Sequence, residues 1–317
     1  MAKFQQLTAE REFTIGAGCV VRGSFGGNFD RNGRTYYVNN ITGSSTNDGL
    51  SWNNPMDEVS TAITASEAWR QLQGTDTNDY VRNTIVVQGT GTPYTALTAL
   101  PNYCDIVGLG APANGNGAGI AVIGANGADG IAGTARGLGL YNLQIRSGGD
   151  FYCMDFVNLF RSTIQDCGLF AYAESTTGGM RFSGSSGGNI IRGNHWGSGV
   201  AHANMMTGMQ IDGAAFDHNR IEDNMIEGRT VGIKVEAEAI QCGRTLFRNN
   251  IIGSISGEGC LIGVDDDVDN IGPYSAYHAI YANNFIIATT MATIIDGADT
   301  YWVGNITAHA LTAATES

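Results

Sequence analysis

The segment Ile191-Arg192-Gly193-Asn194-His195-Trp196 combines an apolar residue, two spacers, and an asparagine followed by two mostly apolar positions. The same arrangement returns at intervals of about 20–35 residues, the range in which solenoid proteins repeat. Its copies are Ile221-Glu222-Asp223-Asn224-Met225-Ile226, Phe247-Arg248-Asn249-Asn250-Ile251-Ile252, Tyr281-Ala282-Asn283-Asn284-Phe285-Ile286 and Trp302-Val303-Gly304-Asn305-Ile306, with a weaker one at Thr163-Ile164-Gln165-Asp166. A short repeating unit buries its apolar side only by stacking on its neighbours. The repeat therefore predicts an all-β fold, a parallel β-helix.

A second element, a glycine followed by apolar, variable and apolar residues, accompanies several copies of the repeat. It occurs at Gly179-Met180-Arg181-Phe182, Gly208-Met209-Gln210-Ile211, Gly232-Ile233-Lys234-Val235 and Gly259-Cys260-Leu261-Ile262. Side chains alternate between the two faces of a strand. We therefore expect the variable residues Arg181, Gln210, Lys234 and Leu261 to line the outer face of one sheet.

Composition narrows the class of protein. Glycine is abundant, with 45 among 317 residues, and proline is scarce, with 5; many tight corners would use glycine in this way, because it accepts positive φ without steric cost. The net charge of −13 repels a phosphate backbone, so nucleic acid is an unfavourable partner. No apolar run is long enough to span a membrane, and the N-terminus lacks the apolar core of a secretory signal. We expect folding in a cytoplasm, with six reduced, mostly buried cysteines.

We divide the chain into four parts. Residues 1–34 form a candidate attachment segment, and residues 35–82 contain a strand and then a helix over 60–73. Ser60 is a plausible helix cap and Gly74 a plausible stop. Residues 83–308 form the predicted β-helix, and residues 309–317 form a tail. The helix would cover the open apolar end of the first coil and so prevent end-to-end stacking.

The N-terminal part resembles a known superfamily. The run Tyr36-Tyr37-Val38, the turn-rich stretch Gly43-Ser44-Ser45-Thr46-Asn47-Asp48-Gly49, Asn54-Pro55 and the following helix look like the leading segment of pectin-lyase-like right-handed parallel β-helix proteins. The asparagine repeats look like the coil repeats of that superfamily. The resemblance covers roughly residues 35–308 and implies a right-handed β-helix. Its members include lyases, hydrolases, phage tailspikes and inert virion parts, so it implies little about function.

Stacked coils would place equivalent positions about 4.8 Å apart. We expect a ladder of hydrogen-bonding side chains at one turn, formed by Asp166, Asn194, Asn224, Asn250, Asn284 and Asn305. The alternative is a set of unrelated asparagines, each favoured by its own turn. Two residues before this column, Arg192, Glu222 and Arg248 would stack as a triplet of alternating charge.

Acidic residues supply candidates for chemistry. A glycosidase needs two carboxylates about 5–9.5 Å apart, and the candidates are Asp212, Asp217, Glu222, Asp223 and Glu227. A lyase would need calcium ligands and a base, for which Asp265, Asp266, Asp267 and Asp269 with nearby Arg248 are candidates. The simpler interpretation of both sets is a solvated acidic surface, and we expect no bound metal and no cofactor.

The resemblance, together with the repeat, the missing secretion signal and the missing catalytic constellation, implies a structural or adhesive virion protein of a bacteriophage-like virus, such as a tail spike, fibre or capsid-surface component. The alternatives are a depolymerase of a host surface glycan, by hydrolysis or elimination, and a non-catalytic carbohydrate-binding adhesin. Expected partners are other virion proteins and a host glycan. Phage spikes of this fold are commonly trimers, which makes a homotrimer one expected assembly. The lack of a trimerisation segment after Asn305 favours a surface-mounted part instead.

Overall fold

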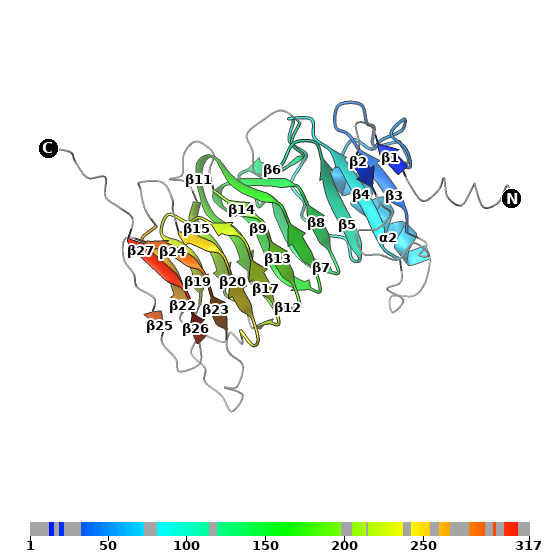
Figure 1. The fold of residues 1–317 in the computed structure, drawn as a ribbon. Coiled ribbons are helices and arrows are strands. Elements are labelled where there is room, and N and C mark those ends of the chain that lie inside the picture. Colours follow the sequence, from blue (N-terminus) through cyan, green and yellow to red (C-terminus); the bar gives the residue numbers. More distant parts are fainter. Residues whose placement is uncertain are drawn as a thin grey trace.

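A computed structural model describes residues 13–15, 19–21, 33–72, 81–113, 119–197, 205–213, 215–236, 242–253, 260–266, 279–288, 294–295 and 301–309. These residues are mostly β-strand, and α2 (Val59–Leu72) is the one helix among them. Two large sheets contain parallel strands, and β1 (Phe13–Ile15) pairs with β2 (Cys19–Val21) in a separate antiparallel pair. Figure 1 shows the strands succeeding one another along a single direction, from β3 near one end to β27 at the other.

The first large sheet has ten strands, and each pairs in parallel with the next one along the chain. We call one passage of the chain from a strand of this sheet to the next a coil. The strands are β3 (Thr35–Val38), β4 (Asn83–Gln88), β5 (Cys104–Leu109), β8 (Gly139–Tyr141), β10 (Thr163–Gln165), β13 (Ile190–Arg192), β17 (Arg220–Glu222), β20 (Leu246–Arg248), β23 (Ile280–Ala282) and β26 (Tyr301–Val303).

The second large sheet has fifteen strands, also paired in parallel from coil to coil. Two long strands, β9 (Gln144–Phe160) and β11 (Gly168–Phe182), run through the whole width of this sheet, whereas later coils divide the same path into separate strands. The others are β6 (Val122–Asn126), β7 (Ile131–Arg136), β12 (Ser186–Gly187), β14 (His195–Trp196), β15 (Met205–Ile211), β16 (Phe216–Asp217), β18 (Met225–Ile226), β19 (Val231–Val235), β21 (Ile251–Gly253), β22 (Ile262–Asp266), β24 (Phe285–Ala288), β25 (Ile294–Ile295) and β27 (Ile306–His309). The chain is thus mostly β with parallel sheets, an arrangement compatible with a parallel β-helix.

The corners on either side of the ten-stranded sheet are built from left-handed residues. One column of positive φ contains Gly137, Arg161, Gly188, His218 and Arg244. A second column contains Asn142, Asp166, Gly193, Asp223 and Asn249, with Asn283 and Gly304 in the two following coils. The first five residues of the second column each lie five positions after a counterpart in the first. Glycine, asparagine and aspartate are the residues that adopt this conformation most readily, which explains why the repeat is rich in them.

The predicted asparagine ladder follows directly after the second column. Asn194 donates from its backbone N–H and from Nδ2 to Oδ1 of Asn224, both at 3.0 Å. The same two bonds run from Asn224 to Asn250, from Asn250 to Asn284 and from Asn284 to Asn305, at 2.9–3.0 Å. Asn194, Asn224, Asn250 and Asn284 are buried, so every rung satisfies donors that would otherwise be costly to bury.

The predicted ladder is wrong at one of its six members, Asp166. Asp166 is exposed and occupies the left-handed column, in register with Gly193. The position in register with Asn194 is Cys167, whose backbone N–H donates to Asn194 Oδ1 at 2.9 Å. The ladder therefore ends at Asn194 on this side, because a cysteine side chain has no amide to continue it.

A second ladder at the other corner was not predicted. Ser162 donates its N–H to Asn189 Oδ1 at 3.0 Å, and Asn189 donates from N and Nδ2 to Asn219 Oδ1 at 3.1 and 2.9 Å. Asn219 N–H then reaches Thr245 Oγ1 at 3.4 Å. The Asn219 Nδ2 atom is buried and has no hydrogen-bond partner among the described residues, while the hydroxyl of Thr245 donates to the Phe216 carbonyl.

The interior is filled by stacked apolar side chains. The middle residues of successive short strands point inward, and from β20 onward they are aromatic. Tyr281 stacks on Phe247 with ring centroids 4.6 Å apart and on Trp302 with centroids 4.4 Å apart. Parallel rings at the coil spacing bury a large apolar area without a gap between layers.

The glycine of the second sequence element marks a crowded position in this interior. A Cβ on Gly208 would lie 2.7 Å from Cγ2 of Ile226, and one on Gly232 would lie 2.6 Å from Cγ2 of Ile252. The next member of the column is Gly263, since Val264 pairs with Ile233 and Asp265 pairs with Lys234. The predicted copy at residues 259–262 is therefore wrong by four residues, and Leu261 does not belong to the outward column.

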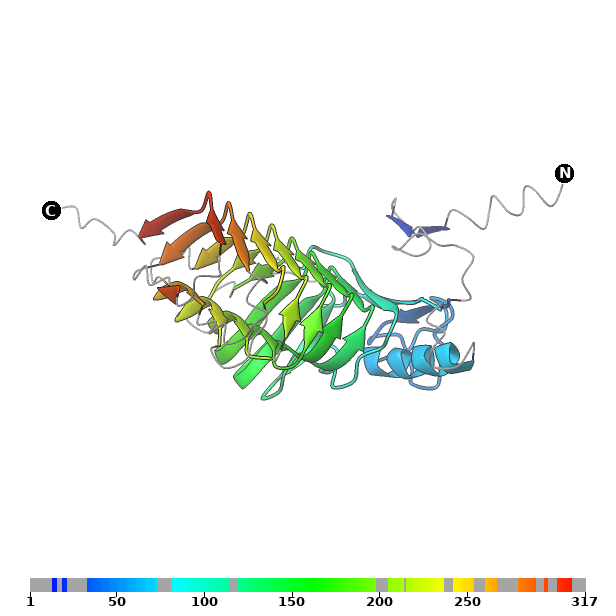
Figure 2. The same ribbon diagram turned by 90° about the horizontal axis from the view of Figure 1, so that it is seen from below.

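The helix α2 lies at the N-terminal end of the stack, as Figure 2 shows. Its buried face consists of Val59, Ala62, Ile63 and Ser66. Asn83 Nδ2 of β4 donates to the Ser66 carbonyl at 2.9 Å, and Tyr36 Oη donates to the Ala65 carbonyl at 3.2 Å. The free edge of β3 also bonds to a loop, through Tyr37 N–H to the Gly49 carbonyl at 2.7 Å. The first coil is covered, as we expected from the sequence.

Several sequence predictions fall outside the described residues. Most of the segment 1–34, the tail after residue 309, Asp267 and Asp269 belong to this group. Of the six cysteines, Cys104, Cys153, Cys167, Cys242 and Cys260 are buried and free. Burial raises the pKa of Cys104, Cys153 and Cys167 to about 12, so these thiols are packing groups. No helix of the described ranges is long and apolar enough to cross a membrane.

Candidate functional site

The five carboxylates proposed for catalysis lie at separate places. Asp212 follows β15 on the fifteen-stranded sheet, whereas Glu222 ends β17 of the other sheet. Asp223 occupies the left-handed corner beside it and is exposed. Asp217 Oδ1 accepts a backbone N–H of the next coil at 2.8 Å. Glu227 is buried just after β18. The structure does not bring these five together into one site.

Glu222 is held between two arginines. Its side chain is 5% exposed, and its two oxygens lie 3.0 Å from Nη2 of Arg220 and 2.7 Å from Nη2 of Arg248. Arg192 is in register with Glu222 as predicted, but its guanidinium donates to Oε1 of Gln165 instead, at 2.8 Å. The predicted triplet is therefore present in register, and Arg248 pairs with Glu222 as predicted, whereas Arg220 takes the place of Arg192 as the second partner. A buried, doubly paired carboxylate is fixed in position and neutralised.

A cluster of polar side chains gathers on the outer face of the fifteen-stranded sheet. The strand register places Asp155, Arg181, Gln210, Lys234 and Asp265 in one row across β9, β11, β15, β19 and β22. We use the name polar cluster for Tyr152, Asp155, Arg181, Ser183, Gln210, Asp212, Lys234 and Glu236. Three of the outward residues predicted from the glycine element thus belong to it.

Arg181 is the centre of the polar cluster. Its Nε and Nη2 donate to Oδ2 of Asp212 at 3.0 and 2.7 Å, and its Nη1 lies 3.7 Å from Oδ2 of Asp155. Ser183 Oγ donates to the other oxygen of Asp155 at 3.1 Å. One cation therefore bridges two carboxylates that come from different coils.

Tyr152 adds an aromatic ring to the polar cluster. The ring lies across Gly178, where a Cβ would come within 2.6 Å of it. The Tyr152 hydroxyl donates to Oε1 of Gln210 at 2.5 Å, two coils away, and the Arg181 guanidinium lies 5.4 Å from the ring centroid. Gln210 Nε2 reaches Oε1 of Glu236 at 3.3 Å, and Lys234 also pairs with Glu236.

Burial changes the acidity of two members of the polar cluster. Desolvation raises the pKa of Asp155 above its ordinary value of 3.8, and the guanidinium of Arg181 opposes this change. Desolvation likewise raises the pKa of Tyr152 to about 12. The Asp212 carboxylate accepts two charge-assisted hydrogen bonds. The two carboxylates beside Arg181 therefore differ in environment.

This arrangement suits recognition of a hydroxyl-rich ligand. Amide, hydroxyl and carboxylate groups recur at the coil spacing of about 4.8 Å, and a tyrosine ring lies beside them. Tyr152 itself is buried, with 7% of its surface exposed, so a sugar would bind to this combination through hydrogen bonds to the polar groups around the ring. The Oδ1 atom of Asp212 is buried without a hydrogen-bond partner, so a hydroxyl donor supplied by a ligand or by water would stabilise it.

The proposed calcium ligands do not form a site in the described part of the chain. Asp265 and Asp266 lie in β22, in register with Lys234 and Val235. Across the described ranges, no group of three or more His, Cys, Asp and Glu side chains gathers as a metal site would require.

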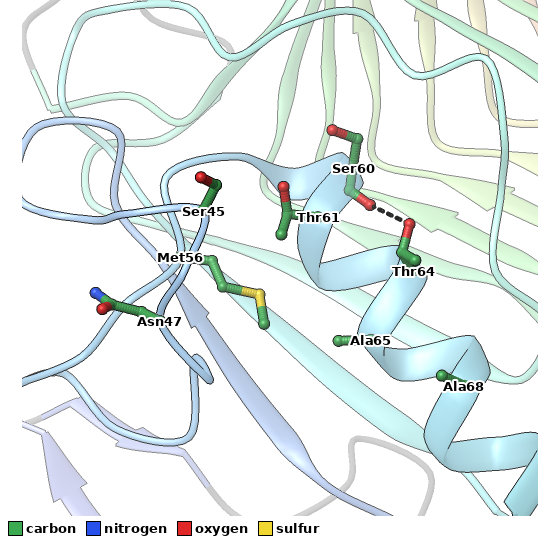
Figure 3. A pocket seen from close by; sticks show the side chains of 8 residues that line it. All are labelled: Ser45, Asn47, Met56, Ser60, Thr61, Thr64, Ala65 and Ala68. Atoms are coloured by element: carbon green, nitrogen blue, oxygen red, sulfur yellow. Dashed lines mark hydrogen bonds between the residues drawn. The ribbon is translucent and has the colours of Figure 1, made fainter.

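A hollow of about 430 Å³ runs along helix α2. Figure 3 shows its lining, in which Ser60, Thr61 and Thr64 project from the helix and Ser45 and Met56 come from the loop that covers β3. The lining contains hydroxyl, amide and small apolar groups and no charged side chain. This hollow is far less equipped for binding than the polar cluster.

No protein-family model matches the chain, and no curated protein matches it in sequence.

Sequence reasoning missed Tyr152, Asp155 and Glu236. Asp155 occurs in a run that alternates apolar and polar residues, Met154-Asp155-Phe156, and this alternation is a signal for an outward position. The link from Tyr152 to Gln210 spans 58 residues. This separation in sequence depends on the lengths of two whole coils, and the asparagine repeat alone does not show which residues of those coils lie side by side.

Proposed function

We propose that this chain is a right-handed parallel β-helix protein of the pectin-lyase-like kind, and that it serves as a structural or adhesive component of a bacteriophage-like virion. The observation that carries the proposal is the pairing of carboxylates with cations, most of which come from adjacent coils. Arg181 joins Asp155 to Asp212, and Glu222 lies between Arg220 and Arg248. Such pairs tie coils together, whereas a general acid or base must be free to reach a substrate.

The coil-to-coil contacts support the fold assignment. Ten short strands pair in parallel in chain order, and two polar ladders follow the same order along the corners. A solenoid gains stability from such nearest-neighbour contacts and behaves as an extended, semi-rigid rod. A rod of this kind suits a particle surface, and mass spectrometry of purified particles from the source organism would test this location.

The polar cluster supports an adhesive role toward a host surface glycan. The test is a panel of bacterial surface polysaccharides, with binding measured by calorimetry and products measured as new reducing ends and as unsaturated sugars. We expect saturable binding without products, and loss of binding in Tyr152→Phe and Gln210→Ala. Gln165→Ala is the matched control, because Gln165 lies on the other sheet. If none of the polysaccharides binds, the adhesive role is rejected and a purely structural role is left.

A depolymerase is the second candidate, and one observation favours it. Burial raises the pKa of Asp155, while Asp212, across Arg181, stays bonded to the guanidinium. Pairs of carboxylates with such different environments serve as acid and base in glycosidases. Products that disappear in both Asp155→Asn and Asp212→Asn, but persist in Asp217→Asn, would establish this activity and overturn the structural proposal.

The assembly can be tested separately by light scattering on the purified chain. A homotrimer would have three times the chain mass of 33.4 kDa and would favour a self-contained spike. A monomer would favour a part held in place by other virion proteins.

A further inference from the structure

The C-terminal end of the coil stack is open, whereas α2 covers the N-terminal end. The strands β26 and β27 are the last of their sheets in chain order, and each has one edge that pairs with no described strand (Figure 1). Trp302, the inward residue of this last coil, is partly exposed, although its counterparts Tyr281 and Phe247 are fully buried. Asn305 is also partly exposed, whereas Asn284 is buried. An uncovered strand edge is a template for pairing with another chain.

The asparagine ladder gives this open end a hydrogen-bonding direction. From Asn194 to Asn284, the backbone N–H and Nδ2 of each rung donate to Oδ1 of the next asparagine toward the C-terminus. Asn305 is the last rung. Its Oδ1 accepts both bonds from Asn284 at 2.9 Å, and its Nδ2 donates to the Tyr281 carbonyl at 2.8 Å. The backbone N–H and the second hydrogen of Nδ2 have no partner among the described residues, so the end needs an acceptor oxygen at the next rung position.

The preceding coils show which other groups a following segment would meet. The Nδ2 of a rung donates to the carbonyl of the inward residue one coil earlier, as Asn305 does to Tyr281. The N–H of the residue after a rung donates to the carbonyl of the preceding rung, as Ile306 does to Asn284 at 2.9 Å. By the same pattern, the carbonyls of Trp302 and Asn305 face the open end. A further asparagine could therefore accept two hydrogen bonds there and donate one.

Apolar side chains surround these polar groups. Tyr301, Val303 and Ile306 are 55%, 58% and 62% exposed. The Trp302 ring lies nearly parallel to Tyr281, with centroids 4.4 Å apart and an angle of 7°, so its other face is directed toward the open end. An aromatic residue of a following coil could stack on that face as Trp302 stacks on Tyr281. Residues 301–309 contain no Asp, Glu, Lys or Arg, so charge does not oppose such a contact.

We propose that the C-terminal end of the stack binds an extended segment of another protein chain, which adds one further parallel coil. The segment carries an aromatic or large apolar residue, two variable residues, an asparagine at the rung position and an apolar residue two positions later. In this mode of recognition, backbone hydrogen bonds provide affinity and side-chain positions provide specificity. The site is separate from the polar cluster and does not rest on the proposed function.

The direction of the ladder argues against a second copy of this chain as the occupant. The N-terminal end of a second copy is covered by α2 and by the loop that bonds to β3. Two C-terminal ends placed together would set one Asn305 against the other. Both would offer donors, while each Oδ1 already accepts two hydrogen bonds. Residues 310–317 contain neither asparagine nor aspartate, so they lack the pattern as well.

The test is binding of a dye-labelled synthetic peptide with the sequence of residues 244–253 to the full chain, measured by fluorescence anisotropy. The peptide carries Phe247 three positions before the rung Asn250, and its two arginines favour solubility. Asn250→Ala in the peptide should weaken binding about tenfold, because both donors of Asn305 then stay unpaired. Asn249→Gly in the peptide is the matched control, since this corner residue is exposed in the fold, and it should leave the affinity unchanged.

Two variants of the full chain locate the site. Asn305→Asp keeps the oxygen that Asn284 needs and removes the donating Nδ2, so it should weaken peptide binding about fivefold. Asn53→Asp makes the same change in an exposed loop at the N-terminal end and should have no effect. Thermal unfolding checks that both variants keep the fold. Bound peptide should also slow backbone hydrogen exchange in residues 301–309.

Four results would overturn the proposal. If the peptide does not bind, or if the Asn250→Ala peptide binds equally well, the end does not recognise a rung. A doubling of the mass with concentration in light scattering, abolished by Asn305→Asp, would identify a second copy as the occupant. Peptide binding that appears only after deletion of residues 310–317 would assign the end to the chain's own last residues.

Discussion

One side-chain oxygen of Asn224 accepts two hydrogen bonds from Asn194, one from the backbone N–H and one from Nδ2, both at 3.0 Å. The Nδ2 of Asn224 in turn donates to the Ile191 carbonyl at 2.9 Å and to Asn250 Oδ1 at 3.0 Å. Each rung thus serves the coil on either side. The rungs are buried, so their hydrogen bonds have no competition from water.

Replacing this rung should destabilise the whole stack. Asn224→Ala leaves two donors of Asn194 unpaired in the interior, and we expect a loss of about 3 kcal/mol in the free energy of unfolding. Asn249→Gly is the control, because Asn249 is exposed and has φ of 55°, which glycine adopts easily. Urea denaturation measures both. Equal effects from the two variants would contradict a special role for the ladder.

The second ladder can be improved at Thr245. Asn219 Nδ2 has no partner among the described residues, and Thr245 offers a hydroxyl where other rungs offer an amide. Thr245→Asn supplies an Oδ1 for both donors of Asn219, and its own amide can donate to the Phe216 carbonyl. We expect a gain of about 1 kcal/mol. Thr163→Asn changes a strand position outside the ladder and should bring no gain; a lower melting temperature for Thr245→Asn would show that the longer side chain does not fit.

Glu222 is expected to act in stability and not in catalysis. Glu222→Gln keeps the shape but loses the charge that joins Arg220 to Arg248. Because both arginines face water in part, we expect a loss of about 1 kcal/mol, smaller at high salt. The comparison is with Asp223→Asn, an exposed neighbour, which should be neutral. Loss of glycan cleavage in Glu222→Gln, with stability unchanged, would reverse the assignment.

Asp155 predicts a pH dependence of stability. Burial raises the pKa of Asp155 in the folded state above 3.8. Ionising this carboxyl group therefore costs more in the folded chain than in the unfolded chain. Stability contributed by Asp155 is therefore greatest at low pH and falls as the pH rises through the folded pKa.

Asp155→Asn removes this titration. The unfolding free energy of the variant minus that of the wild type should be more positive at about pH 7 than at about pH 3. Urea denaturation across this range measures the difference, and Asp48→Asn in an exposed turn supplies the baseline. A difference that shrinks as the pH rises would mean that Arg181 outweighs burial.

The corner structure was predictable from sequence, because it depends on residues close together in the chain. Asparagine after a residue that tolerates positive φ, next to an alternating strand, occurs in every copy from Asn194 to Asn305. The prediction is wrong at Asp166 because that copy has Cys167 at the rung position, and the aspartate stands one position earlier. The error at Gly259 arose in the same way, since another glycine stands four residues later at the crowded position.

The polar cluster could not be predicted to the same extent. Arg181 and Asp212 are 31 residues apart, and their contact depends on the length of an intervening coil. The sequence indicated that Arg181, Gln210 and Lys234 face outward, because alternation is local. Which carboxylate each of them meets depends on the register between coils, and that register became visible only in the paired strands.

The two left-handed columns divide each coil into a part of constant length and a part of variable length. From Arg161 to Asp166, Gly188 to Gly193, His218 to Asp223 and Arg244 to Asn249 the interval is always five residues. The remainder of each coil varies: Asp166, Gly193, Asp223, Asn249, Asn283 and Gly304 follow one another after 27, 30, 26, 34 and 21 residues. Insertions are therefore confined to the far side of each coil. The ten-stranded sheet can therefore keep its register while the rest of each coil changes in length and in the surface that it presents.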